Sequence, residues 1–196
     1  MAVGTALLVM SDEALLKKAI ADDRESLDEL FRRYRLVAFR VAHRLLGNEA
    51  DALDAVQDAF VKALIHLPSF QGRSSFKTWM LRVVSNAALD LGRQRGRRET
   101  LSMDALGPTY REECEPIIVP DPSRELDRLD LRRKLHEALA QLPIAQRQTF
   151  VLHAEAELSY REVAETLGIS IGTVMSRLYY ARQRLRVLIE PWMKPQ

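Results

Sequence analysis

The side chains best placed to do chemistry lie at residues 170–188, whose sequence is SIGTVMSRLYYARQRLRVL. Apolar residues recur there at helical spacing and predict a buried stripe formed by Val174, Leu178, Ala181, Leu185 and Leu188. The opposite surface then presents, near the start of the helix, Ile171, Thr173, Ser176, Arg177 and Tyr180. Side chains of these types can read base edges in the DNA major groove. The arginines further along fit phosphate or solvent contacts: Arg182, Arg184 and Arg186.

The residues before this helix predict a helix-turn-helix. Ser159 and Glu162 have the spacing of a capping box, so a first helix should begin at Tyr160. Its inward face would consist of Val163, Ala164 and Leu167. The turn would consist of Gly168 at positive φ, Ile169 as an apolar corner residue and Ser170 as the N-cap of the second helix. A solvated amphipathic helix is the alternative, but the features in register favour DNA binding.

A second candidate site is the loop at residues 68–79, with the sequence PSFQGRSSFKTW. Small polar groups, an aromatic ring and cations surround a glycine directly before a predicted helix. A pocket that captures an extruded base needs parts of this kind. An ordinary polar turn is the alternative, and the loop alone would favour it. Downstream, a basic run indicates affinity for polyanions: Arg93, Arg95, Arg97 and Arg98.

A third candidate is the predicted helix at residues 51–67, DALDAVQDAFVKALIHL. Its buried stripe is predicted to be Ala52, Ala55, Val56, Ala59, Phe60, Ala63 and Leu64. A second face is left over, made of Asp54, Gln57, Asp58, Val61 and Ile65. Acidic residues beside exposed apolar ones are typical of a protein-docking surface. A solvated acidic face is the alternative.

These segments must be positioned by helices, and the sequence predicts an all-α protein with two small domains. Residues 1–98 would form the first domain, which reads as helices with short joints from Asp12 to about Gly92, including one that stops at Gly47-Asn48 and one that places Trp79 on its buried face. Residues 97–123 lose all periodicity. Residues 99–123 hold four prolines and six acidic residues, which predicts a flexible acidic linker. Residues 124–196 would form the second domain, with Ser123 as an N-cap and a further helix opened by Pro143.

Composition bounds the possibilities. The chain has 196 residues, of which 47% are hydrophobic and 29% charged, which predicts a globular protein. Its net charge is only +2, so the distribution of charge along the chain says more about nucleic-acid binding than the total does. A single cysteine excludes an internal disulfide and a cysteine-based zinc site. The apolar opening residues lack a basic region and a cleavage site, and no window is long enough to span a bilayer. We expect a cytoplasmic protein without membrane insertion.

Nothing in the sequence indicates an enzyme. The four histidines are far apart and are not paired at metal-ligand spacing: His43, His66, His136 and His153. The glycine-containing stretches lack the lysine and strand context of a phosphate-binding loop, and there is no nucleophile elbow. We therefore predict no catalytic residue, no metal and no cofactor.

Taken together, the two halves resemble the extracytoplasmic-function group of bacterial RNA polymerase sigma factors. The resemblance lies in ALDAVQDAFVKAL, in FQGRSSFKTWMLRVVSNAALDLGRQRGRR, and in LPIAQRQTFVLHAEAELSYREVAETLGISIGTVMSRLYYARQRL. Two unrelated motif blocks thus occur in the family's order. The resemblance implies a sigma region 2 helical bundle, with core-binding and minus-ten functions, joined by the acidic linker to a sigma region 4 helix-turn-helix. The implied function is to direct core polymerase to specific promoters and to melt promoter DNA by binding unpaired bases more strongly than duplex.

The resemblance also implies site residues. Contacts with the clamp helices of the largest core polymerase subunit would come from Asp54, Gln57, Asp58 and Val61. Contacts with the minus-ten element would come from Phe70, Gln71, Arg73, Ser74, Ser75, Lys77, Arg82, Asn86 and Arg93. Contacts with the minus-thirty-five element would come from Tyr160, Arg161, Ile171, Thr173, Ser176, Arg177, Tyr180 and Arg184. The polymerase flap region and an anti-sigma factor are further implied partners, and the linker would thread through the polymerase cleft.

The sequence departs from the family pattern at two places in the promoter-opening block. Arg73 follows the loop glycine where an acidic residue is often expected, and Val83-Val84-Ser85 precede Asn86 where the family often has Ile-Ala. The promoter sequence therefore cannot be carried over from relatives. Two alternative functions stay open at this point: a stand-alone helix-turn-helix transcription regulator, and an adaptor that binds only proteins.

Overall fold

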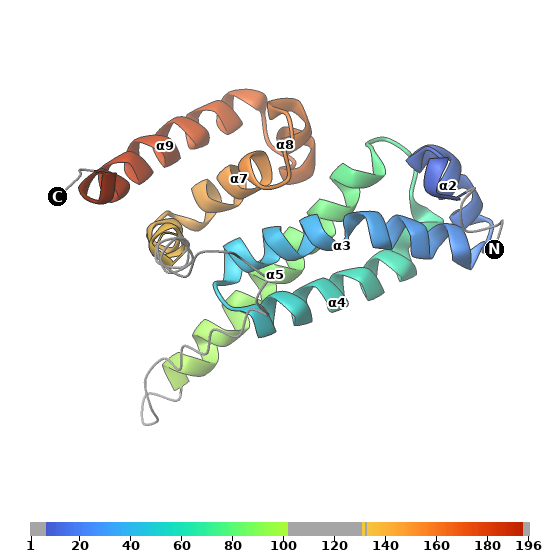
Figure 1. Cartoon of the computed structure of the whole chain (residues 1–196), viewed down its shortest axis with the longest axis horizontal. Helices are drawn as coiled ribbons and strands as arrows, with labels where there is room; N and C mark the ends of the chain where they lie inside the picture. Colours follow the sequence, from blue (N-terminus) through green and yellow to red (C-terminus); the bar gives the residue numbers. More distant parts are fainter. Residues whose placement is uncertain (1–6, 102–130, 132, 194–196) are drawn as a thin grey trace, which may run out of the picture.

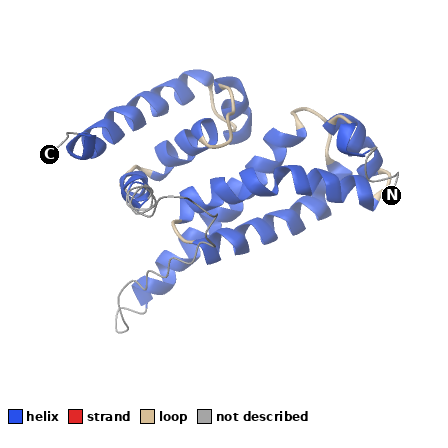
Figure 2. Cartoon of the chain, viewed as in Figure 1, coloured by secondary structure: helices blue, strands red, loops and turns tan. Residues whose placement is uncertain are grey.

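The computed structural model describes residues 7–101, 131 and 133–193, and all regular structure in these residues is helical (Figures 1 and 2). The all-α prediction is therefore confirmed. The helices are α2 (Asp12–Ile20), α3 (Arg24–Leu46), α4 (Glu49–His66), a 3₁₀ turn η1 (Leu67–Ser69), α5 (Phe76–Leu101), α7 (Ile144–Ala154), α8 (Tyr160–Leu167) and α9 (Ile171–Met193). Most of the predicted linker, and the predicted N-cap at Ser123, lie outside the described residues.

Helices α3, α4 and α5 lie side by side and form the N-terminal bundle, with α2 packed at one end (Figure 1). The stripe of α4 is built from small side chains, which lets the neighbouring helices approach closely: Ala52, Ala55, Ala59 and Ala63 are all buried. Leu64, predicted to belong to this stripe, is 50% exposed. That prediction is wrong because Leu64 lies one residue, about 100° of helix rotation, beyond Ala63.

The joint between α3 and α4 is fixed by its cap residues. Gly47 ends α3 at φ +92°, and Asn48 starts α4 by accepting a hydrogen bond from the Asp51 N–H at 2.8 Å. The predicted stop is thus confirmed. A Cβ at Gly47 would also lie 2.3 Å from Nε2 of His136, so an alanine here would have to displace that ring as well as adopt an unfavourable backbone conformation.

Helix α5 is longer than its sequence indicates. Gly92 and Gly96 disfavour the helix near its end, but the helix continues to Leu101. A glycine inside a helix costs only about 1 kcal/mol relative to alanine. Packing of the preceding turns, with Val84, Ala87 and Ala88 buried against the bundle, outweighs that cost.

An ion-pair network attaches α2 and the residues before it to α3. The buried Glu29 accepts from Arg32 at 2.7 Å and from Arg33 at 2.8 Å. Arg33 also pairs with Asp12 at 2.7 Å and donates to the Leu7 carbonyl at 3.0 Å. The hydrogen bonds from Arg32 and then Arg33 lower the pKa of Glu29 to about 2.

The C-terminal half consists of helical residues 133–140 followed by α7, α8 and α9. It does not stand apart from the bundle: a single apolar core continues from Leu15 and Val84 to Val163 and Leu178. Helix α8 packs on α5, and α7 packs on α3 (Figure 1). The two predicted domains therefore share buried surface, although the sequence separates them by a long aperiodic segment. The proposed boundaries at residues 98 and 124 stay predictions.

Candidate nucleic-acid interface

The turn between α8 and α9 has the geometry that its sequence predicts. Ser159 Oγ accepts from the Glu162 N–H at 3.3 Å, and the Glu162 carboxylate accepts from the Ser159 N–H at 2.8 Å, which completes the capping box. The Ser159 hydroxyl also donates to the Glu162 carboxylate at 2.7 Å, and this bond, followed by the one from the Ser159 N–H, lowers the pKa of Glu162. Gly168 adopts φ +65°, and Ser170 Oγ accepts from the Thr173 N–H at 3.1 Å. A helix-turn-helix is confirmed.

The predicted outward residues of α9 divide into two groups. Ile171, Ser176, Tyr180 and Arg184 are exposed, and so is Arg161 on α8. Thr173 and Arg177 are only partly exposed, and the Thr173 hydroxyl lies 2.8 Å from the Ser170 hydroxyl within the cap. The most exposed side of α9 therefore does not include Arg177.

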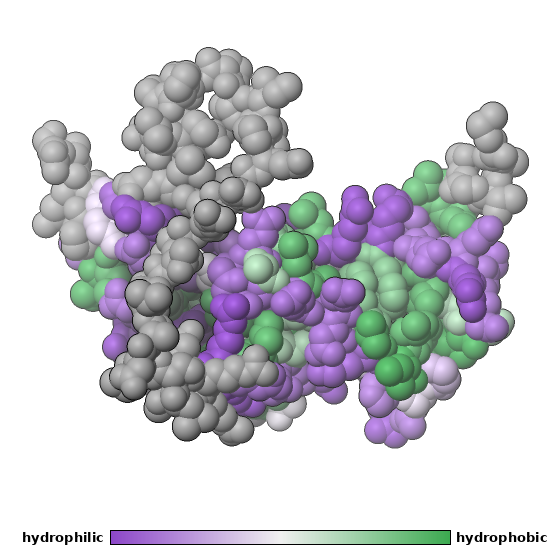
Figure 3. Space-filling model, turned by 90° about the horizontal axis from the view of Figure 1, so that it is seen from below, coloured by the Kyte–Doolittle hydropathy of each residue, from purple (hydrophilic) through white to green (hydrophobic). Residues whose placement is uncertain are grey.

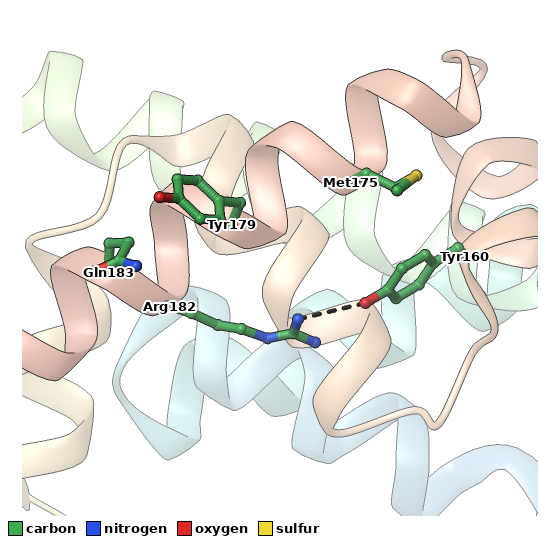
Figure 4. Close-up of a pocket in the computed structure, with 5 residues that line it drawn as sticks. All are labelled: Tyr160, Met175, Tyr179, Arg182 and Gln183. Atoms are coloured by element: carbon green, nitrogen blue, oxygen red, sulfur yellow. Dashed lines mark hydrogen bonds between the residues drawn. The ribbon is translucent and has the colours of Figure 1, made fainter.

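A groove that the sequence did not predict lies beside α8 and α9 (Figure 4). It is lined by Tyr160, Met175, Tyr179, Arg182 and Gln183. Met175 is 54% exposed and Tyr179 58% exposed, while Arg182 donates to the Tyr160 hydroxyl at 3.3 Å. The available signal was the four-residue spacing of Ile171, Met175 and Tyr179, which places them on one face beside the buried stripe. Apolar side chains there resembled core residues.

The loop before α5 is partly fixed by aromatic contacts. Phe70 packs on Trp79 with ring centroids 5.2 Å apart, and Trp79 packs on Phe76 at 5.7 Å. Trp79 is partly buried against the core, as predicted. At the start of α5, Ser75 Oγ accepts from the Thr78 N–H at 3.1 Å. The phenyl ring and the cap thus hold the loop while its middle projects outward.

Within this loop, Gln71 and Arg73 are exposed on either side of Gly72, whose φ is +66°, and Ser74 is partly exposed. Two residues on α5 that were predicted to contact DNA are also accessible. Asn86 is exposed, and Arg93 is exposed and paired with Asp90 at 3.3 Å. Lys77 is partly buried.

Arg82 differs from its neighbours because it contacts the other half of the chain. Its Nε donates to the Thr166 carbonyl at 2.8 Å, and its Nη2 donates to the Glu165 carbonyl. Both acceptors belong to the C-terminal turn of α8, where the helix dipole is negative. The guanidinium is therefore engaged within the protein.

The face of α4 predicted to dock a protein is accessible. Asp54, Gln57, Asp58 and Val61 are all exposed, with Asp58 paired to Lys62 at 2.7 Å. Leu53, Leu64 and Ile65 add further apolar side chains to the exposed surface of α4, and each of these residues is 50–66% exposed. Figure 3 views the molecule from below Figure 1, which is the side on which α4 lies. Apolar side chains appear among polar ones on this side. A polar groove also runs along the surface between the packed helices α4 and α5, and its lining includes Asp54, Asp58 and Asp90.

Within residues 7–101, 131 and 133–193 there is no group of three or more His, Cys, Asp and Glu side chains that could hold a metal ion. None of the helices in this described part combines the length and the apolar character needed to cross a bilayer. Two histidines that are distant in sequence do come together, however: the rings of His43 and His136 have centroids 6.2 Å apart.

Comparison with known proteins identifies both halves. Residues 30–98 match the Sigma-70 region 2 family and residues 132–185 match the Sigma-70, region 4 family. The chain is 37% identical to the ECF RNA polymerase sigma factor SigE of Mycolicibacterium smegmatis, over 82% of this chain and 60% of that protein. It is 29% identical to the ECF RNA polymerase sigma-E factor of Haemophilus influenzae, over 94% of this chain and 98% of that protein.

Two solved structures share the fold over most of the chain. CnrH, in complex with the cytosolic domain of CnrY, has a TM-score of 0.70 and 26% identity, covering 92% of this chain and 97% of that one. The sigma factor RpoE from Bartonella quintana, in complex with the anti-sigma factor NepR, has a TM-score of 0.63 and 27% identity, covering 83% and 97%. The chain therefore belongs to the extracytoplasmic-function type of bacterial RNA polymerase sigma factors.

Proposed function

We propose that this sigma factor places core RNA polymerase on promoters by holding the minus-ten element with the loop before α5 and reading the minus-thirty-five element with α9. The observation that carries the proposal is one chain with two accessible, differently built surfaces. One is a loop with exposed Gln71 and Arg73, and the other is a capped helix-turn-helix. Promoter opening needs only stronger binding to unpaired bases than to duplex, so no covalent catalysis is required.

For the minus-thirty-five element, the accessible face of α9 includes Met175 and Tyr179 as well as the predicted Ser176 and Tyr180. Apolar side chains in the major groove contact the methyl group of thymine, whereas arginines prefer guanine. We therefore place base reading on Met175 and Tyr179 more than on the partly buried Arg177. Met175→Ala should weaken binding to a preferred site and reduce the preference for thymine over the other bases at the contacted position. Val187→Ala, on an exposed position near the end of α9, is the matched control.

Core polymerase is proposed to dock on α4, with the flap region of polymerase as a contact of the C-terminal half. The exposed acids of α4 beside Val61, Leu64 and Ile65 support the first contact. An anti-sigma factor is a proposed partner because the similar RpoE of Bartonella quintana was solved with NepR. The protein would act without enzymatic activity, in the cytoplasm with the polymerase.

The two halves would have to separate on the promoter. Elements at minus ten and minus thirty-five lie about 25 base pairs apart, which is about 85 Å of B-DNA at 34–36 Å per turn. In the structure α5 and α8 touch directly, with Arg82 Nε 2.8 Å from the Thr166 carbonyl. Both elements therefore cannot be bound in this arrangement, and the predicted linker would have to span the opened halves.

Run-off transcription with purified core polymerase and a promoter library tests the proposal. The expected result is specific initiation only when this chain is added. Protection of duplex DNA by the chain alone, with no polymerase-dependent transcript, would favour the stand-alone regulator. Indifference to every DNA would favour a protein-binding adaptor.

A further inference from the structure

We define the seam as the contacts between residues 7–101 and residues 133–193, which include the shared apolar core and several polar contacts. Besides Arg82, the seam contains the Arg44–Glu155 ion pair at 2.7 Å. Arg147 Nη1 donates to the Leu45 carbonyl at 3.3 Å, so a second guanidinium lies at this end of α3. The seam thus holds cations in partly buried surroundings.

His43 and His136 face each other at the same end of the seam. Their ring centroids are 6.2 Å apart, and both side chains are partly buried. The ring of His136 occupies the space beside Gly47, where no Cβ fits. His136 Nδ1 is buried and has no hydrogen-bond partner. The ring is therefore held by packing, and that nitrogen has no acceptor ready for an added proton.

The charged groups around the pair mostly oppose protonation. Burial lowers the pKa of His43 first and the charge of Arg44 lowers it further, while Glu49 and Glu155 raise it. Burial also lowers the pKa of His136, and His43, Arg44 and Arg147 add to that effect against Glu137. Glu155 is already paired with Arg44, which leaves it less able to compensate another cation. A proton on either ring adds charge to a cationic, poorly solvated site.

We propose that the His43–His136 pair is an acid-responsive element of the seam, whose protonation separates the two halves and releases Arg82 from the carbonyls at the end of α8. In the opened chain each ring is solvated and titrates near its ordinary value of about 6.5. The closed arrangement is therefore fully favoured above that pH, and loses stability as the pH falls below it. For each pH unit in the responsive window the open-to-closed ratio rises up to about tenfold per histidine, or about hundredfold for the pair.

One consequence rests on the proposed function: Arg82, once released from α8, becomes available to contact promoter DNA. The opening itself can be measured without polymerase. The full chain with Cys114→Ser would carry dyes at Glu13→Cys in α2 and Ser176→Cys in the first half of α9, both exposed positions in opposite halves. Single-molecule energy transfer, recorded from about pH 8 to about pH 5, would report the fraction of open molecules. Circular dichroism on the same samples would show that the helices remain folded.

The expected result is a low-transfer population that grows as the pH falls below about 6.5, and that grows less steeply in His43→Gln and in His136→Gln, each of which keeps one of the two rings. His66→Gln, at an exposed histidine outside the seam, should behave like the unsubstituted chain. Both single variants are included, so that poor folding of one leaves the other to decide. An open fraction that stays constant with pH, or that rises equally in the glutamine variants, overturns the proposal. Opening without any promoter-specific transcription would instead refute only the proposed function.

Discussion

Replacing Arg82 by alanine should open the closed arrangement without disturbing either half. The guanidinium makes two hydrogen bonds to carbonyls at the C-terminal end of α8, one of them 2.8 Å from Nε to the Thr166 oxygen. Hydrogen bonds from a charged donor contribute about 1.5–3 kcal/mol when shielded, and the helix dipole adds about 0.3–1 kcal/mol. Because Arg82 is exposed, solvent reduces these values.

A net loss of about 1–2 kcal/mol is therefore expected, which corresponds to an increase of about 5–30-fold in the open-to-closed ratio. The assay is the same energy-transfer measurement between α2 and α9, made at a single neutral pH. Arg93→Ala is the matched control, because Arg93 is an exposed arginine on the same helix whose partner, Asp90, belongs to that helix. Circular dichroism should show the same helix content in both variants, because the Arg82 contacts join the two halves and are not needed for the helices of either one.

An unchanged open fraction in Arg82→Ala would refute the reasoning, since it would mean that the two carbonyl contacts do not hold the halves together. An equal increase in Arg93→Ala would refute it as well, because a general loss of positive charge would then explain the effect. Arg82→Lys separates charge from geometry: it retains the attraction to the helix end but cannot reach both carbonyls in the same way.

Three further predictions concern separate parts of the chain. Gly47→Ala should destabilise the protein by at least about 1–2 kcal/mol in urea unfolding, because its φ is +92° and the new Cβ would displace the His136 ring; an unchanged midpoint would contradict this. Glu29→Gln should flatten the dependence of stability on pH between about 4.5 and about 2, since the lowered pKa of Glu29 supplies stability that is present above 4.5 and lost as the pH falls to 2; parallel profiles of the two proteins would exclude it. Charge reversal at Asp54 and Asp58 should weaken retention of core polymerase while circular dichroism stays constant; undiminished retention would remove α4 from the docking surface.

Much of the candidate site could be predicted because its signals are local. The capping box of Ser159 and Glu162, the positive φ of Gly168 and the Ser170 cap each depend on atoms within about four residues. Helical periodicity likewise placed Asp54 and Asp58 on an exposed face. These features determine which helices form and which of their sides face water, so the fold class and the recognition helix followed from the sequence.

Periodicity was less reliable at the edges of a buried stripe. It assigned Leu64 to the interior, and it drew attention away from Met175 and Tyr179, which are exposed. An apolar residue about 100° from the centre of a stripe is buried only if another helix covers that side. The covering element is a tertiary fact, and no spacing along one helix reports it.

The sequence by itself determined the helices, their caps and the exposed loop and helix faces that we propose bind the promoter. Only the tertiary structure decided that the halves close on each other, that Arg82 rests on the end of α8, and that His43 meets His136. Capping and amphipathic periodicity are written into neighbouring residues, so they can be read along the chain. The side-chain hydrogen bonds of the seam join residues 63 to 111 positions apart, and which residues meet depends on how the surfaces of the two helical halves fit together.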